Sequence, residues 1–503
     1  MRNALTLVLG GLALALAVKG VVSRRKRNPR RLPLPPGPKG LPLLGNLRQL
    51  PKARPWEGYH ELCKEYGDIL YLEVMGQRML ILGSRRRAVD LFEKRAANYS
   101  NRPSGLLIEM MNLDWMFVFM QYGLEWRRQR RAFHQYVNSH AVGQYHPVMY
   151  EERNILLRRL KTHPDDFLKH LHSFLATILM RMAYGLGEKH NVALIREAET
   201  SFTAFATART PGKYLVNTFP ILRHIPAWFP GAGFRRHFQE VAQMNRKLLH
   251  EPFDAAKKNS AHGKSDHPSM ASTFIEHLLP PETDPNRPEL ETDARKVCAQ
   301  SYFAGAQSMV NLGSGLILAL ANNPEVQRKA RAEIDSVVGS DRLPTVSDRE
   351  SLPYVHAVVK EINRWHSVTP LGAPRASVED DEYDGYFIPK GTMIFPNNWA
   401  VMHDPEVFDR PFEFIPERYL KDGKIDRSVP DSEYAAFGHG RRNDAIFVLA
   451  SSILATFDIT PPKDEAGNYV HLELKFRNHP TAAQLLPFEC DIKLRPGRES
   501  LVV

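Results

Sequence analysis

A stretch of 28 residues with helical period, Asp293–Leu320, is the feature that most limits what this chain can fold into. Apolar residues recur along it at the spacing of one continuous helix. Pro324 then stands in the first turn of a second helix, Pro324–Val338, where proline is favoured. The apolar stripe predicted for this second helix consists of Val326, Ala330, Ile334 and Val337.

The rest of the pattern predicts a helix-rich body with a minor sheet. Two β-rich runs, Ile69–Val74 and Arg78–Gly83, are separated by Met75-Gly76-Gln77 and indicate a hairpin. The chain has 503 residues, more than the about 250–300 at which one hydrophobic core usually stops growing. We therefore expect either several domains or one large, multi-lobed fold.

Composition excludes several classes of protein. Hydrophobic residues make up 43% and charged residues 24%, which is ordinary for a globular protein and excludes a disordered chain, a collagen-like fibre and a multi-span membrane protein. Only three cysteines occur, Cys63, Cys298 and Cys490. They exclude a disulfide framework and a cysteine-rich zinc module, and they fit a chain in the reducing cytosol.

The net charge of +11 is concentrated at the N-terminus. Residues 1–31 contain no acid and eight bases: Arg2, Lys19, Arg24, Arg25, Lys26, Arg27, Arg30 and Arg31. Without these eight, the 67 bases become 59 against 56 acids. A nucleic-acid-binding protein would need a basic face on the folded body, so we expect no nucleic-acid partner.

The N-terminus has the pattern of a membrane anchor, which we place at residues 1–22. Residues 4–18 are apolar or glycine apart from Thr6, and Val21 and Val22 extend the run past Lys19, whose ammonium can reach the headgroups. This is near the lower length limit of a spanning helix, about 17–25 residues. A cleaved signal peptide is the alternative, but its bases would precede the apolar run. Here they follow it, which predicts a lumenal N-terminus and a cytosolic body.

Residues 23–46 form a basic and proline-rich hinge in this interpretation. Five prolines lie in Leu32–Asn46, LPLPPGPKGLPLLGN, and they favour a stiff, extended connector. The remaining residues, 47–503, are assigned to the folded body.

Five short segments stand out along this body. Glu361-Ile362-Asn363-Arg364 places an acid and an arginine on one helix face, where they can pair. The other four are Trp126–Arg130, Ala304–Ser308, Phe414–Tyr419 and Phe437–Arg442 (FGHGRR). Each is commonplace alone, but their order and spacing together are not.

This set resembles the cytochrome P-450 superfamily, the haem-thiolate monooxygenases, over nearly the whole chain. It is most similar to fungal microsomal members of the O-methylsterigmatocystin oxidoreductase-like group. The resemblance implies a mainly α fold with a small β-lobe in a single large, multi-lobed domain. It also implies haem as cofactor and NADPH- and O2-dependent oxidation of an apolar small molecule in secondary or xenobiotic metabolism. The partner would be an NADPH–cytochrome reductase, and the location the endoplasmic reticulum membrane with the body cytosolic.

The same resemblance assigns roles to individual residues. Glu361 and Arg364 would form a buried triad with Arg418. Haem contacts would come from six residues: Trp126, Arg130, Arg375, Phe437, Gly440 and Arg442. Guanidinium and indole N–H groups suit a buried propionate.

On the distal helix the resemblance assigns dioxygen and proton handling to Gly305, Gln307 and Ser308. The family has an acid where this chain has Gln307, so proton delivery would run through water. The alternative is an ordinary buried helix. Substrate contacts would come from Leu113 and Phe117 within Leu106–Phe119, from Ala304, from Leu371 within Val368–Ala373, and from His479–Pro487. A Met- and aromatic-rich segment is more often plain core.

The iron ligand is the main departure from the family pattern. After FGHGRR the family continues to the ligating cysteine, but here Asn443 follows Arg442 at once. A block of roughly eight residues that would hold the thiolate is missing, so we assign no metal ligand. His439 could in principle bind iron, but it stands at a variable family position. The alternative function is therefore a non-catalytic, membrane-anchored remnant, or the product of a splicing or gene-model error.

Overall fold

The computed structural model describes residues 27–103, 105–136, 141–208, 213–217, 219–226, 228–262, 267–432, 443–477 and 482–502. The chain divides into two compact units, in each of which distant segments of the sequence meet. Unit 1 comprises Met1–Leu50, Tyr59–Pro103 and Pro374–Pro396. Unit 2 comprises Pro51–Gly58, Ser104–Ala373 and Asn397–Val503. The anchor predicted at residues 1–22 lies outside the described residues and stays a prediction.

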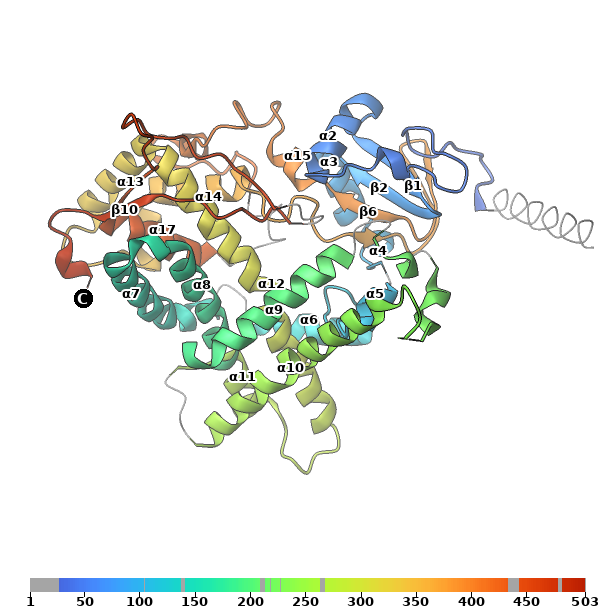
Figure 1. Ribbon diagram of the computed structural model, residues 1–503, viewed down its shortest axis with the longest axis horizontal. Helices are drawn as coiled ribbons and strands as arrows, with labels where there is room; N and C mark the ends of the chain where they lie inside the picture. Colours follow the sequence, from blue (N-terminus) through green and yellow to red (C-terminus); the bar gives the residue numbers. More distant parts are fainter. Residues whose placement is uncertain are drawn as a thin grey trace, which may run out of the picture. The chain divides into compact units, whose positions relative to one another are not determined.

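Unit 1 is built on a four-stranded sheet in the order β1 (Ile69–Val74), β2 (Gln77–Leu82), β6 (Met393–Pro396) and β3 (Arg375–Ala376). β2 pairs antiparallel with β1 and parallel with β6, as the blue and orange arrows of Figure 1 show. Met75 and Gly76 both have positive φ, 49° and 82°, which suits a two-residue hairpin turn. The predicted hairpin is confirmed, with its second strand beginning at Gln77.

The proline-rich part of the hinge lies along unit 1, without helix up to Gly40 and then in a turn at Leu41–Gly45. The backbone N–H groups of Tyr71 and Phe387 donate to the carbonyls of Pro36 and Pro33, each at 2.8 Å. The remaining elements of this unit are β4 (Asp381–Tyr383), β5 (Tyr386–Ile388), α3 (Arg85–Val89), α4 (Ala96–Tyr99) and the part of α2 (Pro55–Tyr66) from Tyr59 on.

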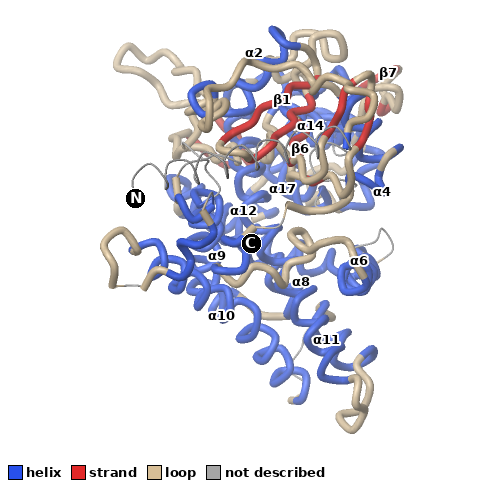
Figure 2. The backbone as a smooth tube through the Cα atoms, turned by 90° about the vertical axis from the view of Figure 1, so that its right-hand side faces the viewer, coloured by secondary structure: helices blue, strands red, loops and turns tan. Residues whose placement is uncertain are grey.

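Unit 2 is mainly helical (Figure 2). Its principal helices are α5 (Leu106–Met110), α6 (Leu124–Tyr136), α7 (His146–Thr162), α8 (Phe167–Tyr184), α9 (Glu188–Ala208), α10 (Gly233–Ala261), α11 (Met270–Thr273), α12 (Arg287–Asn322), α13 (Pro324–Val337), α14 (Pro353–Trp365), α15 (Asn398–Met402) and α17 (Asn443–Thr456). Two small antiparallel pairs accompany them: β7 (Leu420–Lys421) with β8 (Lys424–Ile425), and β9 (Phe457–Thr460) with β10 (Asp491–Leu494). The predicted mainly α fold with a small β part is confirmed.

The helix α12 runs through the hydrophobic core of unit 2. Leu316, Ile317 and Leu320 on it are fully buried and belong to one cluster with residues of α8, α14 and α17. Among the described helices α12 is the one long and apolar enough to cross a membrane, yet most of its apolar window is buried inside the fold. It is therefore a core helix.

The predicted stripe of α13 is correct at three of its four positions. Val326, Ala330 and Ile334 are buried. Val337 is 44% exposed because α13 ends at this residue, so the expectation that Val337 packs in the core is wrong.

Candidate functional site

Glu361, Arg364 and Arg418 meet in unit 2 as one ion-pair network. Both carboxylate oxygens of Glu361 accept from Arg364, with Nε–Oε2 and Nη2–Oε1 distances of 2.8 Å. Arg418 Nε lies 3.1 Å from Glu361 Oε2, and the backbone N–H of Ile415 donates to Oε1 at 2.8 Å. The side chains of Glu361 and Arg364 are 0% exposed. The sequence-predicted triad is thus assembled as a fully buried, bidentate pair with a third member.

The remaining donors of Arg364 hold the chain that follows α15. Its Nη1 donates to the carbonyls of Met402 and Pro411, and its Nη2 to the carbonyl of Glu413. A buried guanidinium has five N–H donors that all need acceptors. Arg364 therefore both neutralises Glu361 and ties a segment without regular structure to α14.

The helix α6 presents Trp126 and Arg130. The guanidinium of Arg130 lies over the rings of Phe117 and Phe133, 5.8 and 5.9 Å from their centroids, and it pairs with no carboxylate among the residues that the structure describes. Part of the side chain is exposed, and burial of the rest lowers its pKa. An aromatic-flanked cation without a carboxylate partner suits an anionic group such as a propionate.

The other predicted haem contacts are placed differently. Arg375 begins β3 in unit 1, where its guanidinium stacks on the Phe92 ring at 4.4 Å. Phe437, Gly440 and Arg442, together with His439, lie outside the described residues. Their roles stay predictions.

Gly305, Gln307 and Ser308 lie in the middle of α12. A Cβ added to Gly305 would lie 2.9 Å from Cδ1 of Leu179 on α8, so the two helices pack closely at this glycine, and its role in dioxygen handling stays a prediction. Ser308 Oγ donates to the Gly305 carbonyl at 3.0 Å. Gln307 faces a cavity.

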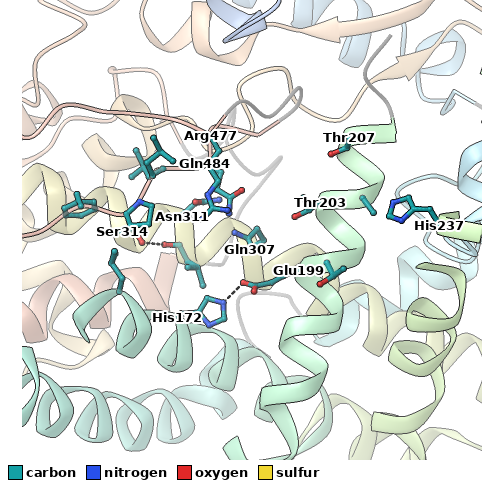
Figure 3. Close-up of a pocket in the computed structure, with 18 residues that line it drawn as sticks. His172, Glu199, Thr203, Thr207, His237, Gln307, Asn311, Ser314, Arg477 and Gln484 are labelled. Atoms are coloured by element: carbon teal, nitrogen blue, oxygen red, sulfur yellow. Dashed lines mark hydrogen bonds and ion pairs between the residues drawn. The ribbon is translucent and has the colours of Figure 1, made fainter. Parts of the chain in front are cut away.

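This cavity, of about 590 Å³, lies in unit 2 between α8, α9, α12 and the segment Gln484–Phe488. Figure 3 shows Gln307, Asn311 and Ser314 of α12 on one side and Glu199, Thr203 and Thr207 of α9 on another. Glu199 is paired with His172 of α8. Sequence reasoning singled out Gln307 but missed the rest of this polar set, although Asn311 and Ser314 follow Gln307 at the spacing of one helix face.

Of the predicted substrate contacts, the segment His479–Pro487 contributes Gln484, Leu485, Leu486 and Pro487 to the wall of this cavity, whereas Leu113, Phe117 and Leu371 are not among its lining residues. Leu113 and Leu371 are buried, and Phe117 packs edge-on against Phe133 at 5.3 Å. Of Ala304 only its place in α12 is described. Within the described residues, Leu113 belongs to a core cluster with Met111, Trp115 and Met116, the plain-core alternative for a Met-rich segment.

The three cysteines do not supply a thiolate for iron. Cys63 lies in α2, Cys298 in α12, and Cys490 just before β10, and all three are buried free thiols. Burial raises the pKa of Cys63 and of Cys490 to about 12 and raises that of Cys298 as well. The described donors thus suit the propionates of a haem, and the residues that directly follow Arg442 offer no thiolate for its iron.

The helix that follows the missing block is intact. α17 begins at Asn443, and Asp444 in its first turn pairs with His146, at 3.0 Å, and with Arg349, at 2.8 Å. Desolvation opposes ionisation of Asp444, but these two partners hold the pKa of its carboxyl below its ordinary value. The start of α17 is thus fixed from α7 and from the segment before α14.

Comparison with a family model and comparison with individual known proteins point to the same family. A family model described as cytochrome P450 matches residues 35–485. The chain is 51% identical over 502 residues to the cytochrome P450 monooxygenase COX1 of Coprinopsis cinerea, over 97% of this chain and 96% of that protein. It is 38% identical over 499 residues to COX2 of the same fungus, with 97% and 94% covered. The tryptamine 4-monooxygenase of Psilocybe cyanescens is 33% identical over 482 residues, with 92% and 93% covered.

Proposed function

The chain belongs to the cytochrome P450 family of monooxygenases, and from this premise we propose that its body is built to oxidise a small molecule with a largely apolar skeleton, in secondary or xenobiotic metabolism. Family membership implies haem as cofactor and a reductase as electron donor. We propose specifically that NADPH supplies the electrons through a membrane-bound cytochrome reductase.

The buried network of Glu361, Arg364 and Arg418 is the observation that supports this proposal most. Two fully buried charges are expensive to maintain, so their pairing at the family's positions supports a core of the family's kind around α14. By resemblance this network locks the core behind the haem. Its role is structural, because its donors and acceptors are used within the protein.

Haem, when bound, supplies the centre at which dioxygen is activated, and this chain's own contribution is to hold the macrocycle. We propose that Trp126 and Arg130 bind a propionate from α6, with Arg375 and Arg442 as further donors. Gln307 and Ser308 would carry protons by way of water, since neither side chain ionises. No side chain of the described residues offers the iron a thiolate, so no oxidation step is assigned to the chain as it stands.

Replacing Arg130 with alanine tests the propionate site. One hydrogen bond to a charged group contributes about 1.5–3 kcal/mol, so we expect haem affinity to fall by roughly one to two orders of magnitude. The measurement is a haem titration of the apoprotein, followed by optical absorbance. Arg131→Ala, which removes the exposed arginine next to it, is the control. Equal haem affinity in Arg130→Ala and the parent would remove Arg130 from the site.

A second candidate function is a non-catalytic, membrane-anchored remnant. The absence of a cysteine between Arg442 and Asn443 is the observation that favours it. Sequencing the transcript across this junction distinguishes the monooxygenase from the non-catalytic remnant, because it shows whether the cell's own message lacks the cysteine. A cysteine codon in the cellular message would make the gap a gene-model error and restore the monooxygenase in full.

We further propose that residues 1–22 anchor the protein once in the endoplasmic reticulum membrane with the body in the cytosol. The bases that follow the apolar run support this orientation. Protease added to intact microsomes should then digest the C-terminal body without detergent. A body that is protected until detergent is added would reverse the orientation.

A further inference from the structure

The cavity between α8, α9, α12 and Gln484–Phe488 is lined unevenly. Val310, Leu485 and Phe488 give it an apolar part, and Gln307 and Asn311 give it an amide-bearing part on one face of α12. Residues four apart on a helix lie one above the other. Figure 3 shows both amide side chains directed toward the cavity.

Asn311 carries a hydrogen-bond donor that the protein leaves unused. The residue is 4% exposed, and its Nδ2 has no hydrogen-bond partner among the residues that the structure describes. Buried polar groups in folded proteins are almost always paired. Ser314, on the same face, is different because its Oγ donates within the helix to the Val310 carbonyl at 2.9 Å. On the face of α12 that lines the cavity, Asn311 thus keeps an unmet donor while Ser314 satisfies its own.

Charge in the cavity argues against a charged ligand at this face. Glu199 is the one carboxylate among the described lining residues, and it is already paired with His172. Arg477 also lines the cavity, but its side chain is exposed. What the buried face of α12 offers is a neutral N–H donor beside an apolar surface.

We propose that this cavity binds a mainly apolar molecule that carries a neutral carbonyl or hydroxyl oxygen, and that Asn311 Nδ2 donates to this oxygen. Val310, Leu485 and Phe488 would contact the apolar skeleton. This inference rests on the proposed function and names its substrate class: the molecule has already been oxygenated when it arrives. A preceding reaction must therefore be one that installs an oxygen on the skeleton.

Binding of 1-tetralone and of tetralin to the full-length chain in nanodiscs tests the inference. The two probes share a skeleton and differ in one carbonyl, and equilibrium dialysis against empty nanodiscs corrects for partition into lipid. One neutral hydrogen bond corresponds to a preference of about two- to tenfold for the ketone. Asn311→Leu should abolish this preference, whereas Ser314→Ala should retain it.

Several outcomes would overturn the inference. Equal binding of both probes by the parent protein would do so, as would a ketone preference that survives in Asn311→Leu. Tighter binding of tetralin-1-carboxylate that is lost in Arg477→Ala would identify an anion site instead. If Asn311→Leu does not fold, Asn311→Ala removes the donor without adding bulk and must also lose the preference. Dialysis measures binding and needs neither iron nor turnover, so its result stays valid even if the protein shows no haem spectrum. If the protein is an active monooxygenase but binds both probes equally, the proposed function holds and only this inference is wrong.

Discussion

Replacing Arg364 with alanine is expected to lower the free energy of unfolding by about 3–5 kcal/mol, the usual effect of breaking a buried ion pair by removing one partner. Glu361 would keep a fully buried carboxylate with only Arg418 and one backbone N–H beside it. The carbonyls of Met402, Pro411 and Glu413 would lose their donor as well. A folded domain is stable by only about 5–15 kcal/mol. We therefore expect little soluble protein, and a shifted urea midpoint for what remains.

Two further variants separate this effect from a general loss of an arginine. Arg410 pairs with Glu413 at 3.1 Å, and both side chains are 58% exposed, so Arg410→Ala should cost at most about 1 kcal/mol. Adding Glu361→Gln to Arg364→Ala removes the stranded charge and should recover part of the loss. If Arg364→Ala unfolds at the same urea concentration as the parent, the network does not stabilise the core.

The sequence was sufficient for the parts of the fold that local pattern controls. Helical period located α12, a proline at the first turn located α13, and two β-rich runs around Met75-Gly76 located the hairpin. The prediction that Val337 packs in the core failed because this residue lies in the last turn of α13. Periodicity shows which face of a helix a residue occupies, but it does not show whether another element covers that face at the end of the helix.

In the candidate site, too, local spacing predicted some contacts and could not predict those that depend on tertiary packing. The pairing of Glu361 with Arg364 followed from their spacing, whereas the addition of Arg418, 54 residues after Arg364, came from resemblance alone. Most of the cavity could not be predicted, because its walls come from α8, α9, α10 and α12 together with Arg477 and Gln484–Phe488, which only tertiary packing brings together. The unused donor of Asn311 is invisible in sequence for the same reason, since whether an amide is paired depends on every element around it.

The chain of 503 residues is expected to show no thiolate-type Soret band in a reduced carbon monoxide difference spectrum, and no monooxygenase turnover. By family resemblance the long-wavelength band requires a cysteine thiolate on the iron, and none follows Arg442. The three cysteines that exist are buried thiols in α2, in α12 and before β10. Haem held by its propionates alone would still absorb light, but the Soret band of its carbon monoxide complex would lie at the wavelength typical of a ligand other than thiolate.

The matched comparison is the same protein with the family's cysteine loop, roughly eight residues, inserted between Arg442 and Asn443. The helix that must follow this loop already exists, because α17 is packed by fully buried Ile446, Phe447 and Ile453, and Asp444 fixes its first turn. The insertion therefore restores a ligand directly before a helix that is already packed, and the thiolate band should appear. A thiolate band in the protein without the insertion would instead mean that Cys63, Cys298 or Cys490 reaches the iron. Since each of these thiols is buried, that result would require a rearrangement of the element that carries it.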